Sequence, residues 1–269
     1  MASTPRPVQS VSNTELYNRW AKVYDTDGNI LQAIDDVLLP PLLDQALRLL
    51  SSSSPIIITE LGCGTGRNTA KLLLPSIPSN ASIKEIKALD LSEGMLVVAK
   101  RRCEALLASM ASSATLAPPT LNFHVFDALN PSIPPDYGIK GSADMVMSTL
   151  VLEHLPLNTF FESIATFLKP NGILVLTNMH SDMGQLSQAG FVDPETGEKV
   201  RGTSYVYEIG KVEEEGRQWG FEVLGNVRER DVRQEDIGEE QLLGPRGKKW
   251  IGVKVWFGLL MRLRGLDAN

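Results

Sequence analysis

The sequence has few cysteines, few histidines and no long apolar run. Its two cysteines among 269 residues, Cys63 and Cys103, belong to no CxxC pair, which excludes a disulfide scaffold and favours a reducing compartment. The three histidines accompany no HExxH or CxxC pattern, so we expect no metal site. The longest apolar stretch, residues 250–261, is too short to cross a bilayer, which requires about 20 residues.

The sequence also lacks a long block of one charge. Lysine and arginine number 26 against 32 aspartates and glutamates, which gives a net charge of -6. An acidic chain without a basic block has no strongly positive surface that would attract a polyanion. We therefore expect a small-molecule ligand and no nucleic acid. Residues 1–10 contain no apolar segment of a secretory signal, and we therefore expect a cytoplasmic protein. No oligomeric state is indicated.

Short apolar runs alternate with helical stretches along the chain. The first run, residues 56–61, is rich in β-branched residues and ends at glycines, as a buried strand entering a turn does. Similar runs follow at residues 86–91, 121–126, 143–148 and 172–178, before a helix at 207–219 and strands at 221–224 and 250–261. This alternation predicts an α/β fold, a Rossmann-like three-layer sandwich with a mostly parallel sheet.

A helical pattern precedes the first strand. An aromatic or leucine side chain recurs every four positions from Leu16 to Tyr24, and a second run covers residues 42–50 after two consecutive prolines. We interpret residues 1–54 as an N-terminal helical cap and residues 55–269 as the main domain.

Two further segments are candidates for substrate contact. Residues 180–206 are polar, contain several glycines and follow the fifth strand, and they are too long for an ordinary connection. Because such loops often cover a site, we expect a substrate-loop insertion there. The basic stretch 246–249 could meet an anionic substrate, although scattered basic residues beside a strand are commonly plain surface.

The segment between the first strand and the next helix, residues 60–66, reads ELGCGTG. Its alternate glycines let the backbone approach a ligand, and the N–H groups of the following helix point toward that ligand. The dinucleotide pattern GxGxxG would place its third glycine at Arg67, so a nicotinamide oxidoreductase is disfavoured. No GxxxxGK[ST] phosphate loop and no GxSxG hydrolase elbow occurs.

Acidic residues occur at the ends of successive predicted strands, beginning with the strand before this turn. Asp90, at the end of the second strand, can accept hydrogen bonds from both hydroxyls of a ribose. Asp127, after the third strand, could accept one from an adenine amino group. Taken singly, Asp90 and Asp127 would be helix caps or turn acids, and Glu60 a solvated strand-end carboxylate. Their succession after the glycine turn favours contact with a nucleoside.

Three segments together resemble the class I S-adenosylmethionine-dependent methyltransferases: residues 60–66, residues 89–96 (LDLSEGML) and residues 168–172 (LKPNG). Within that group the chain is similar to the branch that contains ubiquinone and menaquinone biosynthesis enzymes and many small-molecule methyltransferases. The resemblance implies S-adenosylmethionine as the cofactor. It also implies a seven-stranded sheet whose last strand is antiparallel, with the donor held at the carboxyl ends of its first half.

The resemblance implies a role in donor binding for each matched residue. Gly62 and Gly64 would abut the methionine part of the donor, Glu60 would reach its amino group, and Asp90 would hold the ribose. The other implied residues pack on the adenine, contact its edge, line the sulfonium or close over the donor. They are Tyr17, Trp20, Tyr24, Asn68, Leu91, Met95, Asp127, Ala128, Ser148 and Thr149.

Two histidines, His154 and His180, come directly after the fourth and fifth strands. In a parallel sheet those strand ends share one edge, where a neutral imidazole can take a proton from an acceptor. We therefore predict His154 as a catalytic base, with His180 as a second catalytic candidate and Tyr205 as a further acceptor contact. The alternative for His154 is a helix-terminal residue bonded to backbone, and His124, inside a strand, is interpreted as core.

These observations predict an enzyme that transfers the methyl group of S-adenosylmethionine to an oxygen, nitrogen, sulfur or carbon atom of a small organic acceptor. Because a sulfonium is already a good leaving group, few catalytic residues are needed beyond those that align the reactants. Two alternatives stay open. One is a regulatory protein that binds the donor without methyl transfer, and the other is a protein methyltransferase, for which an acidic groove is expected.

Overall fold

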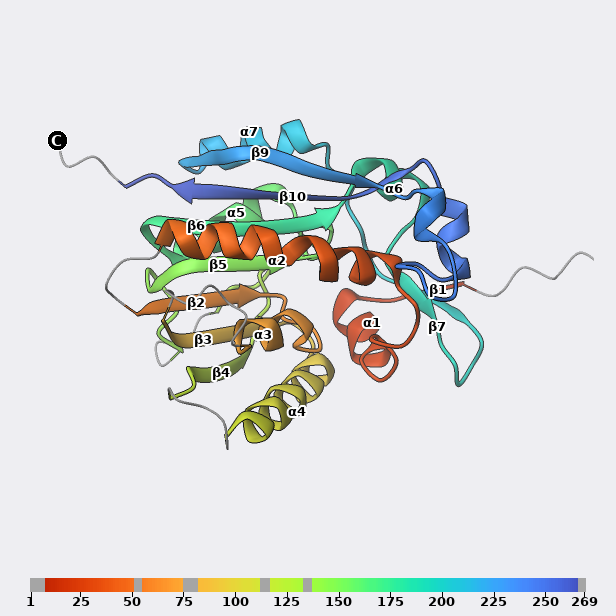
Figure 1. Cartoon of the computed structure of the whole chain (residues 1–269), viewed down its shortest axis with the longest axis horizontal. Coiled ribbons are helices and arrows are strands. Elements are labelled where there is room, and N and C mark those ends of the chain that lie inside the picture. Colours follow the sequence, from red (N-terminus) through yellow and green to blue (C-terminus); the bar gives the residue numbers. More distant parts are fainter. Residues whose placement is uncertain (1–7, 51–54, 75–81, 112–116, 133–136, 266–269) are drawn as a thin grey trace, which may run out of the picture.

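The computed structural model describes residues 8–50, 55–74, 82–111, 117–132 and 137–265, and its main element is a seven-stranded sheet. The strands lie in the order β4-β3-β2-β5-β6-β10-β9 (Figure 1). All are parallel except β10, which runs antiparallel to both β6 and β9. Their bounds are β2 Ile56–Leu61, β3 Ile83–Asp90, β4 Thr120–Val125, β5 Ala143–Thr149, β6 Leu168–Met179, β9 Phe221–Asp231 and β10 Lys254–Leu263.

Helices cover both faces of this sheet and complete three layers (Figure 1). The predicted Rossmann-like sandwich, with the last strand antiparallel, is therefore confirmed. The helices α2, α3 and α4 pack on one face, and α5 and α7 pack on the other. Their bounds are α2 Ile30–Leu50, α3 Arg67–Leu72, α4 Glu93–Met110, α5 Leu157–Phe167 and α7 Ile209–Gln218.

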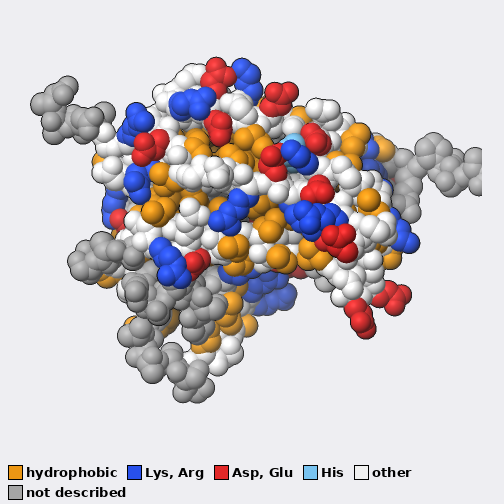
Figure 2. Space-filling view, turned by 45° about the horizontal axis from the view of Figure 1, so that its top comes forward, with side chains coloured by type: hydrophobic (Ala, Val, Ile, Leu, Met, Phe, Trp, Pro, Cys, Tyr) orange, Lys and Arg blue, Asp and Glu red, His pale blue; other side chains and the backbone are white. Residues whose placement is uncertain are grey.

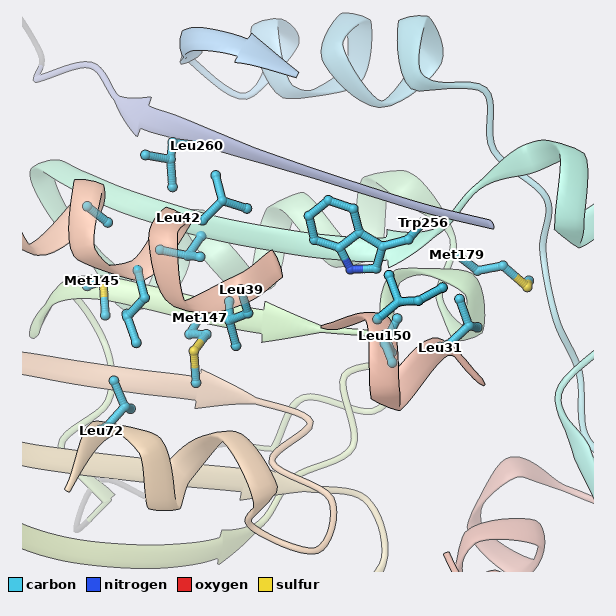
Figure 3. Packing of buried hydrophobic residues seen from close by; sticks show 14 of the residues in the cluster. Leu31, Leu39, Leu42, Leu72, Met145, Met147, Leu150, Met179, Trp256 and Leu260 are labelled. Carbon is cyan, nitrogen blue, oxygen red and sulfur yellow. The ribbon is translucent and has the colours of Figure 1, made fainter. Parts of the chain in front are cut away.

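The helix α2 continues through Pro40 and Pro41, where the sequence pattern predicted that a new helical run would begin. A proline inside a helix removes one backbone hydrogen bond and crowds the preceding turn, at a cost of about 3 kcal/mol or more. Burial of one face outweighs this cost: Leu39 and Leu42 of α2 belong to the same buried cluster as Met145 and Met147 of β5 (Figure 3). Tertiary packing thus overrides the local propensity.

The helix α2 is the larger part of the predicted N-terminal cap, residues 1–54, of which 1–7 and 51–54 lie outside the described residues. It lies on β6 and β10 and so forms part of the sandwich layer. The described remainder contains a short strand at Val8–Ser10 and the helix α1 (Asn13–Trp20), whose first turn is capped by the Ser12 hydroxyl. The division at residue 54 stays a prediction.

A second, three-stranded sheet lies beside the carboxyl end of the main sheet and was not predicted. Its order is β1-β8-β7, with β1 Val8–Ser10, β7 Gly190–Val192 and β8 Lys199–Arg201. The segment 180–206, expected to be a loop, therefore contains the β7–β8 hairpin and also α6 (Ser181–Leu186). Three-residue strands are too short to show a period in the sequence.

The last predicted strand, residues 250–261, begins later than expected. Residues Pro245–Trp250 form the short 3-10 helix η4, started by its proline, and Gly252 turns the chain at a φ of 81° before β10 begins at Lys254. No helix in the described ranges is both long and apolar enough to span a bilayer. Basic and acidic side chains are interspersed over the face shown in Figure 2.

Candidate active site

A cavity of about 120 Å³ opens at the carboxyl ends of β2, β3, β4 and β5, and we call it the first cavity. In a doubly wound parallel sheet, the strand order reverses direction next to the first strand, and the connections on its two sides diverge. A crevice forms there at the carboxyl ends of the strands. Residues from the four strand ends and from α1 meet there. The predicted site residues that line it are Tyr17, Tyr24, Gly62, Gly64, Asp90, Leu91, Met95, Asp127, Ala128, Thr149 and His154.

The three glycines of the turn after β2 all have positive φ, but they serve different purposes. A Cβ atom on Gly62 would lie 2.1 Å from Val151 Cγ2, and one on Gly66 would lie 2.9 Å from the Cα of Ala99 in α4. Gly64 has no atom within 4 Å of such a position. Packing therefore requires Gly62 and Gly66, whereas Gly64 faces open space at the cavity.

Asp90 joins the glycine turn to the end of β3. Its Oδ2 accepts the Gly64 N–H at 2.7 Å and its Oδ1 accepts the Ser92 N–H at 2.8 Å, and the residue is 9% exposed. Burial raises the pKa of Asp90 to about 6, although both backbone hydrogen bonds act in the opposite direction. Each oxygen retains a lone pair, so the carboxylate can still accept hydrogen bonds from a vicinal diol in the cavity.

Glu60 lies behind the cavity and lines none of its surface. It is 1% exposed, its Oε2 accepts the Thr69 hydroxyl at 2.5 Å, and its Oε1 has no hydrogen-bond partner among the described residues. Burial raises the pKa of Glu60 to about 7. Its predicted contact with the donor amino group stays a prediction, and the unpartnered oxygen is where such a contact would be made.

Part of the lining of the first cavity is apolar. Leu91, Met95 and Ala128 line it together with Phe126 and Leu129, two residues that the sequence pattern did not single out. Asp127 also lines it, while its own Oδ1 accepts the Leu129 N–H at 2.9 Å and its Oδ2 accepts the Asn130 side chain. Asp127 is thus both a turn acid and a cavity residue.

Tyr17 and His154 form a hydrogen-bonded pair on the wall of the first cavity. The Tyr17 hydroxyl lies 2.6 Å from His154 Nε2, and Nδ1 lies 3.1 Å from the Thr203 carbonyl oxygen. Because a carbonyl can only accept, Nδ1 carries the proton and Nε2 accepts from Tyr17. Burial raises the pKa of Tyr17 well above its usual value, with smaller contributions from Tyr24 and Glu153, so the phenol stays protonated.

Besides Glu60, three further predicted cofactor-binding residues lie behind or beside the first cavity. Ser148 donates to the Leu61 carbonyl at 3.1 Å, and Asn68 donates to Thr149 Oγ1 at 2.8 Å, both within the buried interior. Trp20 stacks on Tyr17 with ring centroids 5.7 Å apart and faces a different cavity. Their direct contact with the donor stays a prediction.

His180 and Tyr205 do not line the first cavity. His180 begins α6, with Nδ1 accepting the Asp182 N–H at 3.1 Å and Nε2 lying 2.9 Å from Glu229. The Tyr205 ring stacks on Tyr207, and its N–H donates to the Glu153 carbonyl at 2.6 Å. Of the two predicted catalytic histidines, the structure brings only His154 to the first cavity. His124 stacks on Tyr137.

A buried carboxylate that the sequence pattern did not reveal connects the helix after the glycine turn to α2 and to the sheet. Asp35 of α2 is fully buried and accepts four hydrogen bonds. Two come from the glycine-turn helix, from Arg67 at 2.9 Å and Asn68 at 3.0 Å. Two come from the sheet, from Thr177 at 2.6 Å and the Trp256 indole at 3.1 Å. Arg67, noted above as the residue in place of a third dinucleotide glycine, therefore joins α3 to α2.

A second cavity, of about 320 Å³, adjoins the first. Tyr17, Tyr24 and Leu150 line both. Its other walls come mainly from residues 27–31, from residues 187–192, which include β7, and from η4. Trp20, Glu153, Met179, Met183 and Lys199 complete the lining. Two of these wall segments overlap stretches that the sequence marked as candidates for substrate contact, residues 180–206 and 246–249, and their contact with substrate stays a prediction. Within the described part of the chain, no group of three or more histidine, cysteine or acidic residues could hold a metal ion.

Comparisons with known proteins agree with this geometry. Residues 59–176 match the methyltransferase domain family. Over 268 residues the chain is 42% identical to an uncharacterized methyltransferase of Emericella nidulans, an alignment that covers 94% of this chain and 91% of that relative.

Two solved structures illustrate the similarity of fold. The magnesium protoporphyrin IX methyltransferase of Synechocystis PCC 6803 with bound S-adenosylhomocysteine has a TM-score of 0.55 at 16% identity, covering 94% of this chain and 95% of that one. An S-adenosylmethionine-dependent methyltransferase of Mesorhizobium loti has a TM-score of 0.51 at 17% identity, covering 81% and 96%. At these identities the structures support the fold, while the relative of near-equal length supports the family. The chain therefore belongs to the class I S-adenosylmethionine-dependent methyltransferases, and S-adenosylmethionine is its cofactor.

Proposed function

We propose that this enzyme methylates an oxygen, nitrogen, sulfur or carbon atom of a small organic acceptor, as a cytoplasmic member of the small-molecule branch of the family. The observation that carries the proposal is the Tyr17–His154 hydrogen bond on the wall of the first cavity. It supplies a proton-accepting group next to the glycine turn and Asp90, where the nucleoside of the donor would lie.

Three features of the first cavity fit the donor. Gly64 leaves open space that any side chain would begin to fill. Asp90 retains lone pairs for the ribose hydroxyls, and the slot of Leu91, Met95 and neighbouring apolar residues suits a flat base. Behind the cavity, the unpartnered Oε1 of Glu60 suits an ammonium group or a water molecule that bridges to one. When bound, S-adenosylmethionine supplies a methyl group on a sulfonium centre.

Tyr17 and His154 provide a path for the proton of the acceptor. As an acceptor hydroxyl or amine is methylated, its proton can pass to the Tyr17 oxygen while the Tyr17 proton moves to His154 Nε2. The resulting imidazolium keeps its Nδ1–H bonded to the Thr203 carbonyl, which stabilises the charge. His154 thus acts as the base through Tyr17, whose hydroxyl occupies its Nε2.

The two alternative functions fit the cavities less well. A regulator that does not transfer methyl groups has no use for a proton-accepting pair beside an open second cavity. A protein methyltransferase that binds basic peptides needs acidic walls, whereas the second cavity is lined by Lys199, Arg246 and Lys249.

The test measures formation of S-adenosylhomocysteine from S-adenosylmethionine with a panel of small phenols, amines, thiols and carbon nucleophiles, for the wild type, His154→Ala and Tyr17→Phe. We expect His154→Ala to lower kcat by about 100-fold or more. Tyr17→Phe should lower kcat similarly, because both variants interrupt one proton path.

Calorimetric titration with S-adenosylmethionine supplies the control, and we expect its Kd to stay within about twofold of the wild-type value in both variants. A folded protein that binds no donor would overturn the proposal. If the donor binds and His154→Ala lowers kcat by less than about twofold with a true acceptor, His154 is a structural residue.

A further inference from the structure

The second cavity has walls of opposite character at its two ends. Its body is apolar, and Figure 3 shows Leu31, Leu150 and Met179 close together near the carboxyl ends of β5 and β6. The other large apolar lining residues include Trp20, Ile30, Met183, Phe191 and Trp250. Because Tyr17, Tyr24 and Leu150 also line the first cavity, a molecule in this apolar space would lie next to the donor site.

A buried carboxylate without a partner marks the inner end of this cavity. Glu153 lines it, its side chain is 7% exposed, and its Oε2 forms no hydrogen bond among the described residues. Its Oε1 lies 3.9 Å from His154 Nε2, so this carboxylate is close to the proposed base. A buried acceptor oxygen without a donor is costly, and a ligand hydroxyl or amino group would satisfy it.

Three cations line the outer, more exposed side of the cavity: Lys199, Arg246 and Lys249. None of them forms an ion pair within the described ranges of the chain. The Lys249 ammonium lies 4.7 Å from the centre of the Trp250 ring, which helps to form the apolar wall. Burial, together with repulsion from Arg201 and Lys249, lowers the pKa of Lys199.

One carboxylate, Asp27, lies on the same side of the cavity and faces Arg246. It already accepts the Trp20 indole N–H at 2.8 Å and the Asn29 N–H at 3.0 Å. Three cations against one engaged carboxylate leave an excess of positive charge at this end. An anion would lower the mutual repulsion of the cations.

We infer that the second cavity binds the methyl acceptor, and that this acceptor has an apolar body with an anionic group at one end and a hydroxyl or amino group at the other. The anionic group would lie among Lys199, Arg246 and Lys249. The hydroxyl or amino group would lie beside both Glu153 and Tyr17, whose side chain lines both cavities, with its reacting oxygen or nitrogen directly facing the donor. This inference rests on the proposed function and adds the chemical class of the acceptor.

The test uses calorimetric titration of the full chain, saturated with S-adenosylhomocysteine, with 4-hydroxycinnamate, its methyl ester and 4-hydroxyphenyl phosphate. We expect the acid to bind about tenfold or more tightly than the neutral ester, because only the acid carries the anionic end group. A comparison of the acid with the phosphate ester shows which anion the cations prefer.

Variants locate the preference within the cavity. The double variant R246Q/K249Q should lose the preference for the acid, with ester affinity within about twofold of the wild-type value. Lys248→Gln is the matched control, because Lys248 lies between the two mutated residues in sequence yet does not line the cavity, and it should keep the preference. Glu153→Leu should weaken acid and ester alike, since both carry the phenol.

The titration with S-adenosylhomocysteine distinguishes a failure of the proposed function from a failure of the acceptor inference. A folded protein that fails to bind this product contradicts the proposed function. If the product binds but acid and ester affinities agree within about threefold, or no probe binds, only the acceptor inference is overturned. Equal effects of K248Q and the double variant would also overturn it.

Discussion

The first cavity is lined by residues that follow four neighbouring strands, β2 to β5, whereas the second joins segments from the beginning, middle and end of the chain. The shape of the first cavity depends on the backbone of the glycine turn, which the Asp90 carboxylate holds by accepting the Gly64 N–H. The second is organised by side chains on the β7–β8 hairpin, η4 and residues 27–31. A shared donor needs an invariant backbone frame, while the site of a variable acceptor can be built from exchangeable side chains.

The hairpin beside the second cavity is attached to the N-terminal segment by short strand pairing and by side-chain contacts. Strand β8 pairs with β1 over three residues, Arg19 forms an ion pair with Asp193 at 2.8 Å, and Phe191 stacks on Trp20 with centroids 5.3 Å apart. By contrast, the strands around the first cavity are continuous ladders of the main sheet. We therefore expect changes around the first cavity to affect folding and donor binding, and changes around the second to affect the acceptor alone.

The largest difference is expected between two glycines with nearly equal positive φ, Gly62 at 75° and Gly197 at 72°. An alanine Cβ at Gly62 would overlap Val151, whereas at Gly197 it would meet no atom within 4 Å. Gly62→Ala should lower the free energy of unfolding by about 3 kcal/mol and abolish donor binding, since strain and overpacking add.

Gly197→Ala is its matched control and should cost about 1 kcal/mol, from backbone strain alone, with donor affinity unchanged. Urea denaturation and calorimetric titration with S-adenosylmethionine measure both variants. Similar losses in the two variants would contradict the expectation that a change beside the first cavity affects folding and donor binding more than a change in the β7–β8 hairpin.

A smaller effect is expected from protonation of Asp90. Its pKa of about 6 is above that of an ordinary aspartate, so the carboxylate is ionised at pH 7.5 and mostly protonated at pH 5. Only the ionised form can accept from both ribose hydroxyls without presenting a proton of its own. Affinity for S-adenosylmethionine should therefore fall about tenfold between pH 7.5 and pH 5.

Asp90→Asn is the control for this pH dependence. We expect its donor affinity at pH 7.5 to be about tenfold weaker than that of the wild type, a difference of about 1.4 kcal/mol. Between pH 7.5 and pH 5 its affinity should fall less than that of the wild type, because residue 90 no longer titrates in this interval, whereas Glu60, with a pKa of about 7, still does. A wild type whose affinity is constant over this interval would contradict the assignment of Asp90 to the ribose. Titrations in buffers of equal ionic strength give both values.

The smallest effect is expected from Trp20→Phe, which removes the indole N–H that Asp27 accepts but keeps an aromatic ring near Phe191 and Tyr17. Loss of this hydrogen bond should raise the KM of the acceptor by about threefold, because one charge on the wall of the second cavity is reoriented. The Kd of S-adenosylmethionine should not change. A loss of donor affinity instead would place Trp20 in the donor site, as its position in the sequence suggested.

The sheet and most of the first cavity were predictable because their signals are local. The β-branched run before Gly62 and the acid at the end of β3 each lie within a few residues, and parallel topology brings them to one edge. The roles of Arg67 and Asp35 were not predictable, because their bond joins helices far apart in sequence. The pairing of β1 with β8 was not predictable either, because strands of three residues are too short to show a period and these two lie far apart in sequence.

The wall that the two cavities share has a thermodynamic consequence. Tyr17, Tyr24 and Leu150 cannot take positions that suit one ligand without altering the surface that meets the other. Leu150 also has a φ of 57°, a conformation that leucine adopts only when its surroundings enforce it. Donor and acceptor should therefore bind with a coupling free energy, and the factor by which the donor changes acceptor affinity must equal the factor by which the acceptor changes donor affinity.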